Sequence, residues 1–160
     1  MHETYDKLIA LLDANQASYR LIDHEAEGQT DKVSALRGHP VAAAAKCMML
    51  IVKIGKKTTR FALAVVPGNA RVDTNKVKAL FNATYVGFAA TDVAERLAGS
   101  VAGTVLPFAL HPDVTLIVDP SLQSHDEIFF NAARLDRSVA LRTADYMAIA
   151  KPRIERVAAA

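Results

Sequence analysis

The hydrophobic pattern of the first forty residues predicts two short helices and a strand between them. Apolar side chains recur every three or four positions from residue 4 to residue 15, which predicts a helix over 4–15. The segment YRLI at residues 19–22 predicts a short strand. Thr30 is a suitable N-cap for a second helix, and Gly38 stands where that helix would end.

A long apolar run follows, with one charge in its interior. Residues 45–53 predict a strand, a glycine and two lysines predict a hairpin turn, and residues 58–66 predict a second strand. Because side chains of an extended segment alternate between faces, Lys46 should share a face with Met48, and Cys47 should point the other way. Both faces are apolar, which predicts a central strand.

The remaining chain alternates between strands and short helices. Three helices are expected to begin at the N-caps Asp73, Thr91 and Thr143, and Gly99 should end the second of them. Further strands are expected in the ranges 83–90, 115–120, 127–132 and 138–143. This order predicts an α/β (α+β) fold in which a central mixed, largely antiparallel sheet is covered by short helices.

Composition and charge exclude several classes of protein. The chain has 160 residues, of which 51% are apolar and 22% are charged, so we expect one globular domain over residues 1–160. A net charge of +2 neither requires a nucleic-acid partner nor excludes a local basic patch. The single cysteine excludes an intrachain disulfide and suits the cytoplasm. We expect no membrane segment, no metal site and no cofactor, because apolar runs are short and the histidines lack zinc-ligand spacing.

The charge at Lys46 needs an explanation. An ammonium among apolar residues either reaches solvent at the strand end or meets a negative group of a ligand. A second unusual segment, GTVLP, runs from Gly103 to Pro107 between a helix and a strand. Its glycine permits backbone N–H groups to approach a ligand oxygen, although an ordinary turn is the alternative.

Four segments form a pattern that covers nearly the whole chain. They are DHEA at residue 23, AAKCMMLIVK around Lys46, GTVLP, and DPSLQSHDEIFFNAARLDRSVALRTADY near the C-terminus. Together they resemble the YbaK/prolyl-tRNA synthetase-associated editing family, and the HEA and FNA motifs resemble its freestanding YeaK-like subgroup. The family usually has glycine after FNA, where this chain has Ala133, which a left-handed backbone would strain mildly.

The resemblance implies a trans-editing hydrolase that deacylates tRNA mischarged with a small amino acid, in the range of serine, threonine, alanine and cysteine. Lys46 matches the essential lysine of the family, and Gly103 and Pro107 match its pocket loop. No side chain is implied as covalent nucleophile, so water or the tRNA 2′-hydroxyl would attack an ester that Lys46 and backbone donors position. Mischarged tRNA is the implied partner, and an aminoacyl-tRNA synthetase is a further candidate.

Other polar residues are candidates for substrate or tRNA contact. The substrate candidates are His24, Thr30, Thr104 and Asn131, for which a helix cap or a turn contact is the structural alternative. The candidates for tRNA phosphates are Lys32, Lys53, Lys56, Lys57 and Arg60, and Arg37 could extend them; a solvated hairpin is the alternative. Cys47 is expected to be a small buried hydrophobe. A noncatalytic tRNA- or nucleotide-binding module, or a structural partner of a synthetase, would share these features without turnover.

Overall fold

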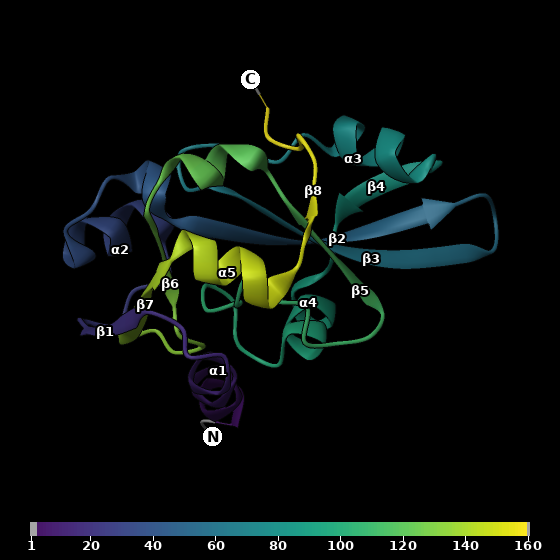
Figure 1. The fold of residues 1–160 in the computed structure, drawn as a ribbon. Coiled ribbons are helices and arrows are strands. Elements are labelled where there is room, and N and C mark those ends of the chain that lie inside the picture. The colour runs from purple at the N-terminus through teal and green to yellow at the C-terminus, as the bar shows by residue number, and fades with distance from the viewer. Residues whose placement is uncertain (1–2, 160) are drawn as a thin grey trace.

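The computed structural model describes residues 3–159 and divides the strands between two sheets (Figure 1). The smaller sheet is antiparallel with the order β1-β7-β6, and its strands are β1 Tyr19–Asp23, β7 Arg137–Arg142 and β6 Glu127–Asn131. The larger sheet is mixed with the order β4-β2-β3-β5-β8. Its strands are β4 Tyr85–Phe88, β2 Ala45–Ile54, β3 Thr58–Pro67, β5 Val114–Val118 and β8 Arg153–Ile154.

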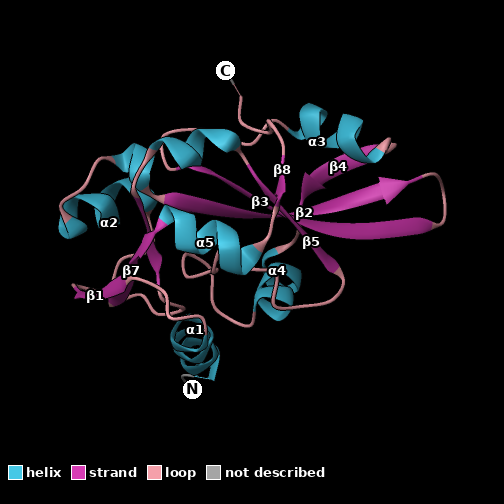
Figure 2. Ribbon diagram, in the orientation of Figure 1, coloured by secondary structure: helices cyan, strands magenta, loops and turns pink. Residues whose placement is uncertain are grey.

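Within residues 3–159, five α-helices and two short 3-10 helices connect these strands (Figure 2). The α-helices are α1 Glu3–Ala14, α2 Thr30–Arg37, α3 Thr74–Phe81, α4 Thr91–Ala98 and α5 Thr143–Ala150. The 3-10 helices are η1 Val41–Ala43 and η2 Pro120–Ser124. The β2–β3 hairpin projects away from the rest of the molecule, and α2 lies at the opposite end.

The predicted α/β (α+β) fold with a central mixed sheet and short helices is confirmed, and three of the strands form a second, smaller sheet. The η2 turn, which Asp119 caps, redirects the chain after β5, so that β6 pairs with β7 instead of joining the larger sheet. An isolated parallel bridge between Ala44 and Phe129 links the two sheets. This bridge brings the beginning of β2 beside β6.

The helices end at the glycines that the sequence predicted, but they do not begin after the threonines predicted as N-caps. Gly38 and Gly99 end α2 and α4 in the left-handed conformation, as predicted. Asp73 caps α3 by accepting the N–H of Asn75 at 2.9 Å. The predicted threonine caps are wrong, because each threonine is the first helical residue, after Gln29, Ala90 and Arg142.

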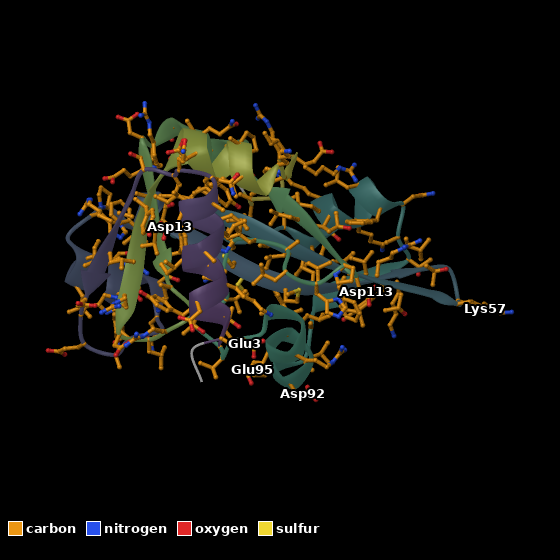
Figure 3. The ribbon with its side chains drawn as sticks, turned by 60° about the horizontal axis from the view of Figure 1, so that its bottom comes forward. Glu3, Asp13, Lys57, Asp92, Glu95 and Asp113 are labelled. Atoms are coloured by element: carbon orange, nitrogen blue, oxygen red, sulfur yellow. The ribbon has the colours of Figure 1, made fainter. Side chains whose placement is uncertain are left out.

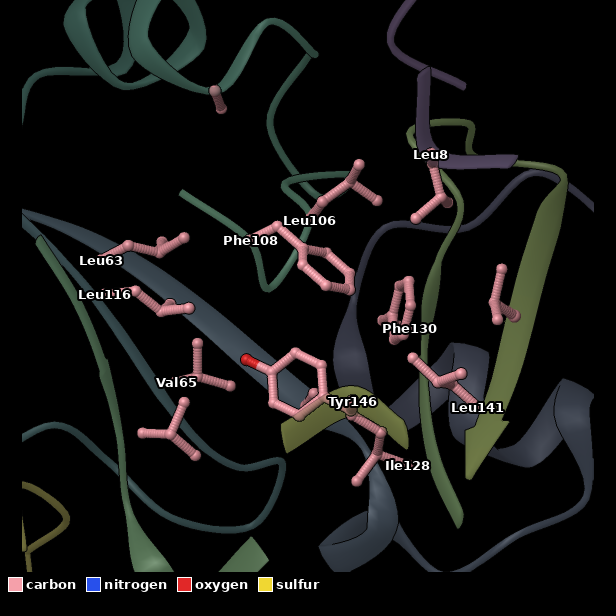
Figure 4. Close-up of a cluster of buried hydrophobic side chains, with 14 of the residues drawn as sticks. Leu8, Leu63, Val65, Leu106, Phe108, Leu116, Ile128, Phe130, Leu141 and Tyr146 are labelled. Carbon is pink, nitrogen blue, oxygen red and sulfur yellow. The ribbon is translucent and has the colours of Figure 1, made fainter. Parts of the chain in front are cut away.

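The two faces of β2 are buried against different groups of side chains, as the alternation predicted. Leu50 and Val52 pack in a cluster with Val77 of α3. Met49 faces the larger cluster between the two sheets, where β3, β5, β6 and α5 meet (Figure 4). Each large apolar side chain buried there contributes about 1.5–3 kcal/mol to folding.

The larger cluster also anchors the loop that contains GTVLP. Phe108 contacts Tyr146 edge to face, with ring centroids 5.3 Å apart. The buried Tyr146 hydroxyl donates to the carbonyl oxygen of Pro107 at 2.6 Å. The C-terminal end of this loop is therefore held by the core.

Ala133 has the left-handed backbone that the sequence led us to expect, with a φ of 59°. We expect Ala133→Gly to raise the free energy of unfolding by about 1 kcal/mol. A left-handed conformation costs alanine about 1–2 kcal/mol, which glycine avoids, but glycine also makes the unfolded chain more flexible, and this offsets part of the stabilisation. Thermal denaturation measures the change. Ala35→Gly on the exposed face of α2 is the control and should lose about 1 kcal/mol. A lower melting temperature for Ala133→Gly would contradict the expectation.

Candidate active site

A cavity of about 250 Å³ lies where α2, the beginning of β2, the end of β6 and the loop before β5 meet. Two cations, Lys46 and Arg37, are part of its wall, and no described aspartate or glutamate lines it. Its positive wall suits a ligand that carries negative charge. A larger hollow of about 780 Å³ beside His125 and Arg142 contains none of the candidate catalytic, substrate-binding or tRNA-binding residues.

Lys46 lies at the beginning of β2, where its half-buried side chain reaches the cavity. Its ammonium donates to the carbonyl oxygen of Ala70 at 2.9 Å. No carboxylate within residues 3–159 forms an ion pair with it. An ammonium has three N–H bonds, so two remain for a ligand.

Gly103 brings its loop into close contact with the loop that contains Gly28. Gly103 has a φ of 86°, and a Cβ atom there would lie 2.9 Å from the Cα of Gly28. The described hydrogen bonds do not engage the N–H of Gly103 or of Val105, both of which line the cavity. These two backbone donors are therefore available to a ligand oxygen.

Three of the predicted residues do not line the cavity. The Thr104 side chain is fully buried and donates to the carbonyl of Val101 at 2.7 Å. Pro107 anchors the loop through Tyr146, as described above. His24 lies outside the cavity, with its Nε2 atom 2.7 Å from the hydroxyl oxygen of Ser138. Thr30, in contrast, is part of the cavity wall.

Asn131 lines the cavity, but its carboxamide is fully engaged by the protein. Its Nδ2 donates to the carbonyls of Glu27 at 2.9 Å and Gly103 at 3.0 Å. Its Oδ1 accepts from Arg37 and from Ser138, each at 2.9 Å. A carboxamide has two N–H bonds and two lone pairs, so no capacity remains for a substrate hydrogen bond. Asn131 instead joins two loops at the edge of the cavity.

The place of Arg37 in the cavity wall was not predicted, since the sequence suggested only that Arg37 could extend the basic patch for tRNA. Thr30, Val33 and Arg37 follow one another at intervals of three and four residues along α2, and all three line the cavity. Residues with this spacing lie on one face of a helix, and this pattern in the sequence could have predicted that the three residues line one site. Burial lowers the pKa of Arg37 to about 10, which leaves its guanidinium charged at neutral pH.

Cys47 contributes to the cavity wall without the properties of a nucleophile. Its thiol approaches the carbonyl oxygen of Ala45 at 3.6 Å. Burial raises the pKa of the thiol well above its usual range. A thiol that stays protonated is a poor nucleophile.

The predicted tRNA-binding residues fall into two separate groups. Lys53, Lys56, Lys57 and Arg60 are exposed on the β2–β3 hairpin, and Lys57 is seen at its tip (Figure 3). Lys32 is exposed on α2, at the other end of the molecule. A strand rises about 3.3 Å per residue, so the hairpin tip lies roughly 30 Å from Lys46.

The described part of the chain offers no place for a metal ion, because no three of its histidine, cysteine, aspartate or glutamate side chains come together suitably. None of its helices is both long enough and apolar enough to cross a bilayer.

Comparison with known proteins adds a family and a fold. The model of the aminoacyl-tRNA editing domain matches residues 24–149. A protein of Escherichia coli K12 described as the multifunctional Ser/Thr-tRNA deacylase ProXp-y is 36% identical over 152 residues, which is 94% of this chain and 90% of that protein.

Two solved structures share the fold at lower sequence identity. One is a hypothetical protein with a TM-score of 0.85 and 21% identity, covering 96% of this chain and 99% of its own. The other is described as a candidate trans-editing enzyme for prolyl-tRNA synthetase, with a TM-score of 0.80 and 16% identity, covering 98% of both chains.

Proposed function

The chain belongs to the aminoacyl-tRNA editing domain family, and we propose that it deacylates tRNA mischarged with serine or threonine. It is an aminoacyl-tRNA deacylase of the trans-editing kind, and the Escherichia coli relative supports these two amino acids. The observation that carries the proposal is the cavity that Lys46, Gly103 and Val105 line together, without a described carboxylate in its wall.

The chemistry of the substrate fits this site. An aminoacyl ester is already activated, so catalysis needs mainly positioning and stabilisation of negative charge on the carbonyl oxygen. Lys46 binds the terminal phosphate or the carbonyl region of the ester, and the N–H groups of Gly103 and Val105 face the carbonyl oxygen. Water attacks the carbonyl carbon, the bond to the ribose oxygen breaks, and the proton that the water loses passes to that oxygen. Attack by the tRNA 2′-hydroxyl would only transfer the acyl group to the 2′-oxygen, so water must complete the hydrolysis.

The dimensions of the cavity favour a small acyl group. About 250 Å³ is below the usual range of small-molecule sites. Val33, Met48 and Phe129 supply apolar wall, and Thr30 supplies a hydroxyl that suits the hydroxyl group of serine or threonine.

A panel of tRNAs charged with serine, threonine, alanine and cysteine tests the proposal. We expect the purified chain to release serine and threonine at least about tenfold faster than alanine, since only the hydroxylated side chains pair with Thr30. Binding of these tRNAs without loss of any ester would overturn the proposal and leave a noncatalytic tRNA-binding module. The cytoplasm, where translation provides the substrate, is the proposed location, and a synthetase partner stays a prediction.

The basic hairpin is proposed to contact the acceptor-stem phosphates. We expect the double charge reversal Lys56→Glu and Lys57→Glu to weaken tRNA binding and to reduce the slope of log affinity against log salt by about 2. Turnover at saturating tRNA should not change, because the cavity is remote. Lys7→Glu on the exposed face of α1 is the control. An unchanged salt slope in the double variant would exclude the hairpin from tRNA binding.

Cys47 is expected to be dispensable for deacylation. Cys47→Ala should keep kcat/KM within about threefold of the wild type, roughly 0.6 kcal/mol, because the thiol supplies no bond to the ester. Treatment with iodoacetamide should likewise leave activity in place, since a half-buried thiol with a raised pKa stays protonated and alkylates slowly. Inactivation that Cys47→Ala prevents would show instead that the thiol is accessible and required.

A further inference from the structure

Arg37 places a positive charge in the cavity wall without a negative partner. No carboxylate within residues 3–159 pairs with it. Its Nε donates to Ser138 at 2.7 Å, its Nη2 donates to Asn131 at 2.9 Å, and its Nη1 lies 3.4 Å from Nε2 of His39. Desolvating a cation is costly, so a guanidinium held only by neutral groups requires a reason.

His39 is neutral in this arrangement. Its Nδ1 lies 2.7 Å from the carbonyl oxygen of Pro40, so Nδ1 carries the hydrogen. The Nε2 atom then has the lone pair that faces Arg37. Burial also lowers the pKa of His39, as does the nearby charge of Arg37. The positive charge of this group of residues therefore belongs to Arg37.

The partners of Asn131 admit only one orientation of its carboxamide. The carbonyls of Glu27 and Gly103 can only accept, so both N–H bonds of Asn131 point toward them. Arg37 can only donate, so it requires the oxygen of Asn131 on its side. Because the donor is charged, this bond is stronger than an ordinary amide hydrogen bond.

Arg37 always donates a hydrogen bond to Asn131, whereas Ser138 can donate its hydrogen elsewhere. Its hydroxyl has one hydrogen, but two acceptors lie near, namely Oδ1 of Asn131 at 2.9 Å and Nε2 of His24 at 2.7 Å. Nδ1 of His24 lies 2.8 Å from the carbonyl oxygen of Glu25 and so carries a hydrogen. The Nε2 atom of His24 therefore competes with Asn131 for the hydroxyl hydrogen. Arg37 is the donor that Asn131 keeps in either case.

We propose that Arg37 is a positioning residue for deacylation, which fixes the carboxamide of Asn131 and, through it, the carbonyl of Gly103. When the carbonyl of Gly103 is held in place, the flanking N–H groups of Gly103 and Val105 keep a fixed direction. These are the groups proposed to donate to the ester oxygen. The proposal rests on the proposed function and deepens it, because it assigns control of the loop to a residue of α2. A positioning residue of this kind affects kcat more than KM.

A double-mutant cycle between Arg37 and Asn131 tests the proposal. We expect Arg37→Met to lower kcat about 10–50-fold with KM within about threefold, and Asn131→Ala to do the same. The double variant should lose no more than the larger single loss, because both changes break one connection. Arg20→Met on β1 is the control, because it removes a nearby exposed arginine. Its kcat and KM should stay within about twofold of the wild-type values.

Two kinetic outcomes would overturn the proposal. Losses that multiply in the double variant, or a rise in KM alone, would show that Arg37 binds the substrate directly. If thermal denaturation shows that Arg37→Met is unfolded, Arg37→Gln takes its place, since it keeps a polar side chain in the cavity wall.

Hydrogen exchange of the Asn131 side-chain amide, followed by NMR, gives a measurement that needs no turnover. Its two hydrogens are bound to carbonyls, so they should exchange slowly in the wild type and at least about tenfold faster in Arg37→Met. Exchange that does not change in Arg37→Met would overturn the proposal even if the enzyme is active. A wild type that consumes no ester would refute the proposed function, whereas the exchange measurement would still decide the role of Arg37.

Discussion

Lys46→Ala is expected to lower kcat/KM for seryl-tRNA deacylation by at least about 100-fold, or about 2.7 kcal/mol of transition-state stabilisation. The ammonium is half-buried, has no carboxylate partner among the described residues and keeps two N–H bonds for the substrate. A charge in such surroundings acts more strongly than one in water. Single-turnover deacylation measures the loss without interference from product release.

Lys53→Ala is the matched control for Lys46→Ala. Lys53 lies on the same strand but is exposed, and the cavity wall does not include it. At saturating tRNA, its replacement should leave the single-turnover rate of deacylation within about twofold of the wild type, because a lost contact with tRNA phosphates would affect binding only. If Lys46→Ala is folded and retains activity within about threefold, roughly 0.6 kcal/mol, then Lys46 has no part in the mechanism.

Gly103→Ala is expected to cost both activity and stability. A φ of 86° is unfavourable for alanine, and the new Cβ would lie 2.9 Å from the Cα of Gly28, so the backbone of one loop must move. We expect kcat/KM to fall about 100-fold, because the N–H groups move with the loop. The free energy of unfolding should fall by about 2–4 kcal/mol, from conformational strain and the steric clash together.

Gly55→Ala separates the effect of conformational strain from the effect of the steric clash. Gly55 also has a positive φ, of 63°, but a Cβ there would meet nothing within 4 Å. This variant should lose about 1–2 kcal/mol of stability and no activity. Should Gly103→Ala lose only as much stability as Gly55→Ala and keep its activity, the close approach of the two loops would have no catalytic importance.

The sequence predicted local structure well because local periodicity determines it. The alternation around Lys46 followed from the strand alone, and the left-handed backbone at Ala133 followed from the family pattern. The smaller sheet could not be predicted, because β1 pairs with β7 from Tyr19 with Leu141 to Asp23 with Arg137, and a pairing over so many positions leaves no local signal. The hydroxyl of Thr143 likewise donates to the distant carbonyl of His125, not to the helix that the residue begins.

Predicting the site was harder for the same reason. Arg37 contacts Asn131 and Ser138, which follow it by 94 and 101 positions, so nothing near it in the chain indicates where its guanidinium points. The sequence suggested Asn131 as a substrate contact, whereas its carboxamide joins two loops that only folding brings together. The separation of Lys32 from the basic hairpin is also a property of the assembled fold.

The partial pairing of β2 has a consequence for how this enzyme can change by mutation. Strand β4 pairs with β2 only from Leu50 to Lys53, so the beginning of β2 lacks a pairing with β4 and has only the single bridge between Ala44 and Phe129 nearby. The peptide carbonyls of Met49 and Lys53 face that side, where Ala89 and Thr84 bind them, and by alternation the peptide groups of Cys47 face it too. Hydrogen bonds from a ligand to these main-chain groups do not depend on which side chain the residue carries. Evolution can therefore exchange residue 47 for other small apolar side chains that fit the core and the cavity wall, while the peptide donor and acceptor beside the cavity persist.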